Sequence, residues 1–177
     1  MDSSDRIEAL KRRIRDVPDF PKKGIVFKDI TTLLADPVAF REAMDLFAVL
    51  CSDTRADKVV AVESRGFIVG GVLAERLGAG FVPVRKPGKL PAATRRITYE
   101  LEYGTDCLEI HEDALRPGDR VLVVDDVIAT GGTARAAADL AERLGAEVAA
   151  HAFLVELTFL NGRAKLGGRP VLSLIRY

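Results

Sequence analysis

Cysteine is scarce in this chain. Only Cys51 and Cys107 occur among its 177 residues, and neither belongs to a Cys-x-x-Cys pair. Neither a disulfide framework nor a zinc site is therefore supported, and we predict no metal-ligating residues in the protein itself. Two reduced thiols are typical of a cytoplasmic protein, which is the location we expect.

An excess of charge of one sign is also absent. Lysine plus arginine and aspartate plus glutamate number 26 each, which argues against a general nucleic-acid binder. No apolar run approaches the roughly 18 residues that a membrane-spanning helix needs. The N-terminal stretch MDSSDRIEALKRRIRD has no apolar core of the kind found in signal peptides. We therefore expect neither a membrane nor a nucleic acid as a partner.

Short β-branched runs alternate with helical patterns along most of the chain. Strands are predicted at 58–62, 80–85, 120–124, 148–157 and 171–175, and helices at 66–78 and 132–144. This alternation predicts a single α/β domain over residues 1–177, with a mainly parallel sheet flanked by helices on both faces. Of the two histidines, His151 lies in a strand pattern and is interpreted as a core residue, and His111 is assigned no catalytic role.

The N-terminal part of the chain has a different pattern. Apolar residues at helical spacing predict an amphipathic helix over 4–16. The stretch 18–31, with two prolines and a glycine, is predicted not to form a regular helix. Asp36 followed by Pro37 is typical of an N-cap and first helical residue, so a further helix is expected to begin there.

Residues 86–117 interrupt the alternation of strand and helix patterns. The runs 97–103 and 107–112 alternate apolar and polar residues around Gly104-Thr105-Asp106, which predicts an antiparallel hairpin inserted between two parallel strands. An inserted hairpin at the carboxyl edge of a sheet is a candidate lid.

The segment VLVVDDVIATGGTA, residues 121–134, carries the clearest chemistry. A buried strand ends in Asp125 and Asp126, and a helix then opens at a glycine-rich turn. Unpaired N–H groups and the helix dipole favour an anion there, while the carboxylates can accept hydrogen bonds from vicinal hydroxyls. The alternative, a capping loop with two solvated aspartates, does not explain why these features coincide. We predict a ribose 5-phosphate site made by Asp125, Asp126, Ala129, Thr130, Gly131, Gly132 and Thr133.

The stretch DDVIATGGT resembles the phosphoribosyl pyrophosphate loop of the type I phosphoribosyltransferases. Five further stretches resemble the adenine-using members of that family, in the same order: PDFPKKGIVFKDIT (18–31), ESRGFIVG (63–70), RKPGKLP (85–91), YELEYGTDCLEIHEDAL (99–115) and LVELTFLNGR (154–163). The resemblance covers nearly the whole chain. It implies a type I phosphoribosyltransferase fold with a flexible hairpin lid and a base-binding hood within residues 1–35.

The resemblance also implies an activity, a cofactor and an assembly. The enzymes of this kind transfer the phosphoribosyl group to N9 of adenine, giving AMP and pyrophosphate in purine salvage. They use Mg²⁺ that is held mainly by the substrate pyrophosphate, and they form homodimers.

Site residues follow from the same resemblance. Arg65, Arg85, Lys86 and Lys89 are expected to bind pyrophosphate, and Val26, Phe27 and Lys28 to contact adenine. Phe27 is equally compatible with a core position. The expected catalytic residues are Glu102, Tyr103 and Arg65. Strand alternation places Glu100 and Glu102 on one face and does not choose between them, whereas the family favours Glu102.

Three other functions fit parts of the pattern less well. A regulator that senses phosphoribosyl pyrophosphate would add a DNA-binding module, for which few residues and no net positive charge are present. An enzyme for a 6-oxopurine such as xanthine is disfavoured by the 18–31 segment. A purely structural α/β module leaves the anion-binding patterns unexplained.

Overall fold

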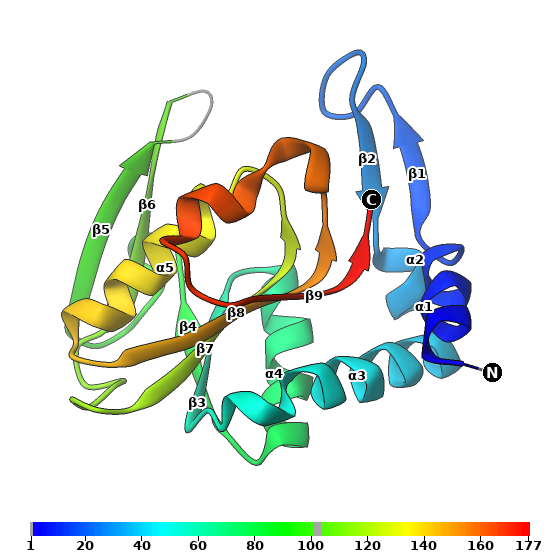
Figure 1. Ribbon diagram of the computed structural model, residues 1–177. Helices are drawn as coiled ribbons and strands as arrows, with labels where there is room; N and C mark the ends of the chain where they lie inside the picture. Colours follow the sequence, from blue (N-terminus) through cyan, green and yellow to red (C-terminus); the bar gives the residue numbers. More distant parts are fainter. Residues whose placement is uncertain (1, 101–103) are drawn as a thin grey trace. The chain divides into compact units, whose positions relative to one another are not determined.

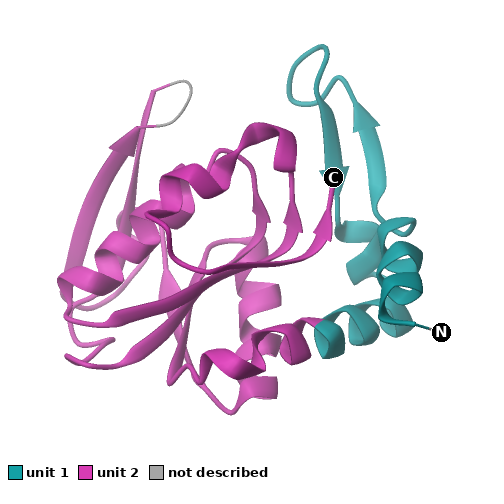
Figure 2. Cartoon of the chain, viewed as in Figure 1, with its two compact units in different colours: residues 1–46 teal, residues 47–177 magenta. Residues whose placement is uncertain are grey.

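The computed structural model describes residues 2–100 and 104–177. The chain divides into two compact units, residues 1–46 and 47–177 (Figure 2). Among the described residues, no helix has both the length and the apolar character needed to cross a membrane. Each unit is described by itself below.

The first unit contains a short helix, a hairpin and the start of a longer helix. Its elements are α1 (Ser3–Lys11), β1 (Arg15–Pro18), β2 (Val26–Asp29), α2 (Thr31–Leu34) and the first part of α3 (Pro37–Cys51). The expected start of α3 is confirmed, because Asp36 Oδ1 accepts hydrogen bonds from the N–H groups of Val38 at 3.0 Å and Ala39 at 3.1 Å.

The predicted helix over 4–16 was partly wrong, whereas residues 18–30 form no helix, as predicted. The helix ends at Lys11, and Arg15–Pro18 pairs antiparallel with Val26–Asp29. Ion pairs across the two strands, Arg15 with Asp29 at 2.5 Å and Lys28 with Asp16 at 2.6 Å, accompany the backbone ladder. Cross-strand pairing thus overrides the helical spacing of the apolar residues.

The second unit is built on a five-stranded sheet in the order β4-β3-β7-β8-β9, in which every neighbouring pair is parallel (Figure 1). The strands are β3 (Lys58–Val62), β4 (Gly80–Val84), β7 (Arg120–Ile128), β8 (Glu147–Glu156) and β9 (Val171–Arg176). The main helices are α4 (Arg65–Leu77) and α5 (Gly132–Arg143), and the short turns η1 (Ser52–Thr54), η2 (Thr158–Leu160) and η3 (Gly162–Leu166) complete the unit. The predicted α/β class and parallel sheet are confirmed.

Helices α4 and α5 cover opposite faces of this sheet. Val60 and Val62 of β3 join the buried cluster that contains the alanines of α5. Val59 and Ala61 face the other way, where the backbone of Gly70 in α4 packs directly on them. Buried His151 in β8 stacks on Phe153 at 6.4 Å between ring centroids, which confirms its interpretation as a core residue.

A two-stranded antiparallel sheet, β5 (Thr94–Glu100) and β6 (Thr105–His111), is inserted between β4 and β7. It begins three residues earlier than the predicted run at 97. Its base is packed into the core, since Ile97, Leu108 and Ile110 belong to the cluster under α5. The predicted hairpin is confirmed, and its tip at residues 101–103 lies outside the described residues.

The strand order fixes where a ligand can bind. From β3 the chain moves outward to β4, whereas from β7 it moves in the opposite direction to β8 and β9. The carboxyl ends of β3 and β7 therefore flank a topological switch point, where the loops that follow the two strands diverge and leave a crevice.

Candidate active site

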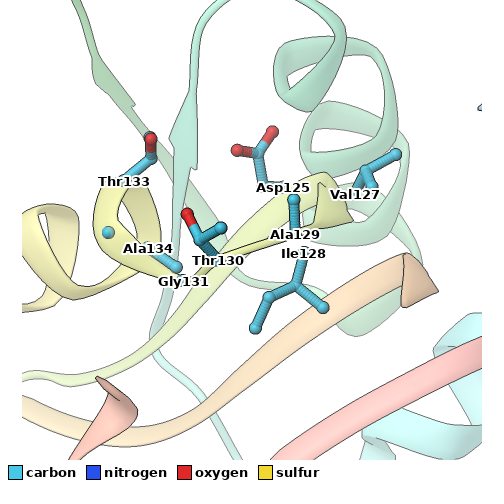
Figure 3. A pocket seen from close by; sticks show the side chains of 9 residues that line it. Asp125, Val127, Ile128, Ala129, Thr130, Gly131, Thr133 and Ala134 are labelled. Atoms are coloured by element: carbon cyan, nitrogen blue, oxygen red, sulfur yellow. The ribbon is translucent and has the colours of Figure 1, made fainter. Parts of the chain in front are cut away.

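A pocket of about 100 Å³ lies where β7 ends and α5 begins. It is lined by Asp125, Val127, Ile128, Ala129, Thr130, Gly131, Gly132, Thr133 and Ala134. Figure 3 shows the side-chain oxygens of Asp125, Thr130 and Thr133 pointing to the same side of the loop. The structure thus brings together all the residues predicted to bind ribose 5-phosphate except Asp126, which is the buried neighbour of Asp125.

The glycine-rich turn opens α5 as expected. Gly131 has a φ of +82° and precedes the helix, whose first residue is Gly132. The first N–H groups of a helix lack intrahelical acceptors and carry the positive end of the dipole. These groups, together with the hydroxyls of Thr130 and Thr133, can bind a phosphate.

Strand β7 extends farther than predicted. It continues past residue 124 to Ile128, because β8 pairs with it as far as Glu156. The two aspartates therefore belong to the strand and not to the loop after it. Consecutive residues of a strand point to opposite faces, which separates the surroundings of the two carboxyl groups.

Asp126 is bound to the first residue of α4. Arg65 Nε donates a hydrogen bond to Asp126 Oδ2 at 2.5 Å, and the Asp126 side chain is only 8% exposed. Asp126 also donates its backbone N–H to Asp125 Oδ1 at 2.9 Å. The structure thus joins the ESRG segment to the aspartate pair across the switch point.

Asp125 lies against the N-terminal turn of α4. A Cβ placed on Gly66 would lie 2.6 Å from Asp125 Oδ1, so a larger residue there would displace the Asp125 carboxyl group. Burial raises the pKa of Asp125 well above its ordinary value of 3.8, and repulsion from Asp126 raises it further. The site therefore holds a carboxyl group in an environment that disfavours its charge.

Three of the four basic residues expected at the pyrophosphate site are paired with carboxylates. Arg65 pairs with Asp126, Arg85 Nε donates to Glu63 Oε2 at 2.7 Å, and Lys86 Nζ pairs with Asp106 Oδ2. The Arg85 guanidinium also lies 5.7 Å from the ring centre of Phe67. Lys89 is exposed, and its carbonyl oxygen accepts a hydrogen bond from Arg85 Nη1 at 3.4 Å.

Gly162, which the sequence analysis did not predict as a site residue, packs against the loop that forms the pocket. The backbone of Gly162, in η3, packs on the loop that contains Ala129 and Gly131. A Cβ at Gly162 would collide with the carbonyl oxygen of Ala129, and would lie 2.8 Å from Ile128 Cγ1 and 3.1 Å from the Gly131 nitrogen. A single glycine followed by arginine gives no signal for such a close approach.

An ion-paired network holds η3 in place. Arg163 donates to both carboxylate oxygens of buried Glu156 at 2.5 and 2.6 Å, and to the carbonyl oxygen of Val171 at 3.0 Å. These bonds anchor the turn to the ends of β8 and β9. The bonds to Glu156 are charge-assisted and their acceptor is buried, so they are stronger than ordinary surface pairs.

The residues expected to contact adenine lie in the first unit, on β2. Val26 is exposed, and Phe27 is half-buried with its ring 5.3 Å from that of Phe20. Phe20 is itself 52% exposed, so this aromatic pair presents an apolar surface. Lys28 pairs with Asp16.

The proton-transfer candidates Glu102 and Tyr103 lie outside the described residues. Glu100, the other glutamate of the same segment, is exposed at the end of β5. Among residues 2–100 and 104–177, no three histidine, cysteine or acidic side chains are grouped closely enough to hold a metal ion.

The raised pKa of Asp125 predicts a pH-dependent effect of Asp125→Asn on stability. Below pH 3.8 the carboxyl group is protonated in both the folded and the unfolded chain, so the substitution has little effect. As the pH rises above that value, the unfolded chain ionises first and the native charge becomes unfavourable, so Asp125→Asn stabilises the fold. Urea unfolding at pH 4 and pH 7 measures the difference, with Asp53→Asn, at an exposed carboxyl group, as the control. An equal effect at both pH values, or a less stable variant at pH 7, contradicts the assignment.

Comparisons with known proteins agree with this geometry. Residues 29–165 match the phosphoribosyl transferase domain. The chain is 60% identical over 171 residues to the adenine phosphoribosyltransferase of Anaeromyxobacter dehalogenans, covering 97% of this chain and 99% of that protein.

Solved structures of the same enzyme have the same fold. The adenine phosphoribosyltransferase of Thermoanaerobacter pseudethanolicus is 56% identical with a TM-score of 0.94, covering 97% of this chain and 99% of the other. The enzyme of Saccharomyces cerevisiae, crystallised with an iminoaltritol bisphosphate and adenine, is 43% identical with a TM-score of 0.92, again covering 97% and 99%. With the pocket at the switch point and a match over most of its length, this chain belongs to the phosphoribosyltransferase family, among the adenine phosphoribosyltransferases.

Proposed function

We propose that this chain transfers the 5-phosphoribosyl group from phosphoribosyl pyrophosphate to N9 of adenine, giving AMP and pyrophosphate, with the switch-point crevice as its site. One observation carries the proposal. The phosphate-binding turn of α5 and the N-terminus of α4 flank the same pair of aspartates. The two helix ends can bind anions, and the carboxylates between them can accept hydrogen bonds from hydroxyl groups. This arrangement matches a sugar that carries phosphate groups at both ends.

The 5′-phosphate binds to the turn from Ala129 to Thr133. Its oxygens accept hydrogen bonds from the first N–H groups of α5 and from the hydroxyls of Thr130 and Thr133. Asp125 and Asp126 accept hydrogen bonds from the ribose 2- and 3-hydroxyls. The pocket of about 100 Å³ at this turn is large enough for a phosphate group but not for a whole nucleotide.

Pyrophosphate binds to Arg65, Arg85, Lys86 and Lys89, beside the N-terminus of α4. The carboxylate partners of the first three keep these cations at the rim of the crevice. Binding exchanges a carboxylate for phosphate oxygens, so each cation loses less hydration and less rotamer freedom than a free surface side chain would.

Mg²⁺ accompanies the pyrophosphate. It prefers oxygen ligands such as those of phosphates, so the substrate pyrophosphate is its main ligand. When bound, it neutralises negative charge on the leaving pyrophosphate.

Adenine binds to the hood formed by Val26, Phe27 and Lys28. Exposed Val26 and the Phe20–Phe27 pair offer apolar contact to a purine ring. Backbone N–H and carbonyl groups of this stretch supply a donor and an acceptor to the base. The adenine in the yeast enzyme's crystal supports the same choice of base here.

In the reaction, the bond from C1 of the ribose to pyrophosphate breaks as the bond to N9 forms. Adenine loses its N9 proton, and Glu102 accepts it, assisted by Tyr103. Arg65 stabilises the developing charge of the leaving group. The hairpin covers the sugar and excludes water, which protects the activated sugar from hydrolysis.

The protein acts as a homodimer in the cytoplasm. Exposed apolar side chains on α4 and β4, among them Ile68 at 46% and Phe81 at 40%, offer a surface for a second copy. Its cysteines are free thiols, as expected in a reducing compartment.

Incubation with phosphoribosyl pyrophosphate, Mg²⁺ and each purine base tests the proposed function. Adenine is expected to give AMP at the highest rate. Faster conversion of hypoxanthine, guanine or xanthine contradicts the choice of base, and binding without any turnover indicates a sensor and not an enzyme.

Glu102→Gln tests the acid–base assignment. A positioned proton acceptor contributes about 10²–10⁴-fold to a rate, so the catalytic constant should fall by about that factor. The affinity for phosphoribosyl pyrophosphate should change little. Glu100→Gln is the matched control and should be close to neutral. A Glu102→Gln variant that keeps more than about a third of the wild-type rate in single-turnover chemistry refutes the role.

Gly162→Ala tests the support of the phosphate turn. Its added methyl group meets backbone atoms of Ala129 and Gly131, so the turn must move. Overpacking of this kind costs about 1–3 kcal/mol, and we expect ribose 5-phosphate to bind about tenfold more weakly or worse. Gly71→Ala, where a methyl group meets open space, is the control. Calorimetry that finds wild-type affinity in folded Gly162→Ala removes this glycine from the site.

A further inference from the structure

The hairpin contacts the phosphate turn through Tyr99. The Tyr99 hydroxyl lies 3.2 Å from Thr133 Oγ1 and 3.3 Å from Asp106 Oδ2. A Cβ on Gly132 would lie 3.8 Å from Tyr99 Cδ2, so the ring lies close against the first turn of α5.

The backbone fixes this placement. Tyr99 lies two residues after Ile97, and alternate residues of a strand share a face. Ile97 is buried in the core cluster against α5, and Tyr99 packs against the same cluster. A rigid, packed ring therefore holds the hydroxyl group at the edge of the pocket. Burial raises the pKa of Tyr99, so the phenol keeps its proton at neutral pH.

The number of protons that the two hydroxyl groups can donate decides which of them is the donor in this contact. Each hydroxyl group has one proton to donate and can accept from another donor. If Thr133 donates its proton to a phosphate oxygen, its own oxygen is left to accept a hydrogen bond. Tyr99 is placed to donate that bond, which fixes the rotation of the Thr133 side chain.

Asp106 supplies the alternative acceptor. It lies opposite Tyr99 in the hairpin register and also pairs with Lys86. When no phosphate is bound, Tyr99 can donate to Asp106 while Thr133 donates to Tyr99. The chain Lys86–Asp106–Tyr99–Thr133 thus connects a cation of the pyrophosphate site with a donor of the 5′-phosphate site.

We propose that Tyr99 is a positioning residue that orients the Thr133 hydroxyl toward the 5′-phosphate and holds the hairpin on the phosphate turn. This inference rests on the proposed function, because it assumes that Thr133 binds the 5′-phosphate. It assigns no chemical step to Tyr99, which acts through Thr133 alone.

A double-mutant cycle tests the inference, with the dissociation constant for ribose 5-phosphate as the readout. Tyr99→Phe keeps the ring and removes only the hydroxyl group. A neutral hydrogen bond contributes about 0.5–1.5 kcal/mol, so the dissociation constant should rise about 2- to 12-fold. Pyrophosphate affinity should change less, because the ion pair of Lys86 with Asp106 remains when the Tyr99 hydroxyl group is removed.

Thr133→Val is the second substitution of the cycle and removes the hydroxyl group that Tyr99 is proposed to orient. Tyr99→Phe should have no further effect in the Thr133→Val background, and should keep its full effect in Thr133→Ser, which retains the hydroxyl group. Thr133→Ala also removes the hydroxyl group and replaces Thr133→Val in the cycle if that variant folds poorly. For the intact enzyme, Tyr99→Phe should raise KM for phosphoribosyl pyrophosphate more than it lowers kcat.

Three outcomes overturn the inference, and they are distinguishable. If Thr133→Val leaves ribose 5-phosphate affinity unchanged, Thr133 does not bind the phosphate and the premise of the inference fails. If Thr133→Val weakens binding but Tyr99→Phe does not, the site stands and only the role of Tyr99 fails. If the two effects are additive, Tyr99 acts independently of Thr133 and is not its positioning residue.

Discussion

Two helices of residues 47–177 begin at the same edge of one parallel sheet, and the chemistry of the site depends on this arrangement. Helix α4 follows β3 and α5 follows β7, so their positive ends meet where the strand order reverses. Asp125 and Asp126 lie between them, one against Gly66 of α4 and one bound to Arg65. N–H donors gathered at two helix ends favour a ligand that carries several phosphate oxygens.

Ion pairs with carboxylates hold the cations of this site in position. Glu63, Asp106 and Asp126 each hold a cation that the substrate would otherwise have to order. Asp125 shows the opposite effect, because its carboxyl group is buried near a like charge and its ionised form is disfavoured. The ionised form of this carboxyl group therefore lowers the stability of the fold at neutral pH.

Much of the second unit could be predicted from local pattern. The β-branched run 58–62 forms β3, and Gly78, with a φ of +64°, ends α4. The hairpin β1–β2 could not, because its pairing overrides a helical pattern that continues through Val17. Partners far apart in sequence, such as Arg65 with Asp126 or Tyr99 with Thr133, follow from the packing of the elements. The contact between Gly162 and Gly131 has no local signal at all, since only the fold brings these two backbones together.

Direct observation of the bound substrate tests the central claim, that phosphoribosyl pyrophosphate spans the crevice between the carboxyl ends of β3 and β7. In a crystal structure with phosphoribosyl pyrophosphate and Mg²⁺, the 5′-phosphate should lie on the N–H groups at Gly131–Thr133. The ribose hydroxyls should face Asp125 and Asp126, and the pyrophosphate should lie beside Arg65. A substrate bound in the reverse direction, or away from the N-terminus of α5, would contradict the assignment.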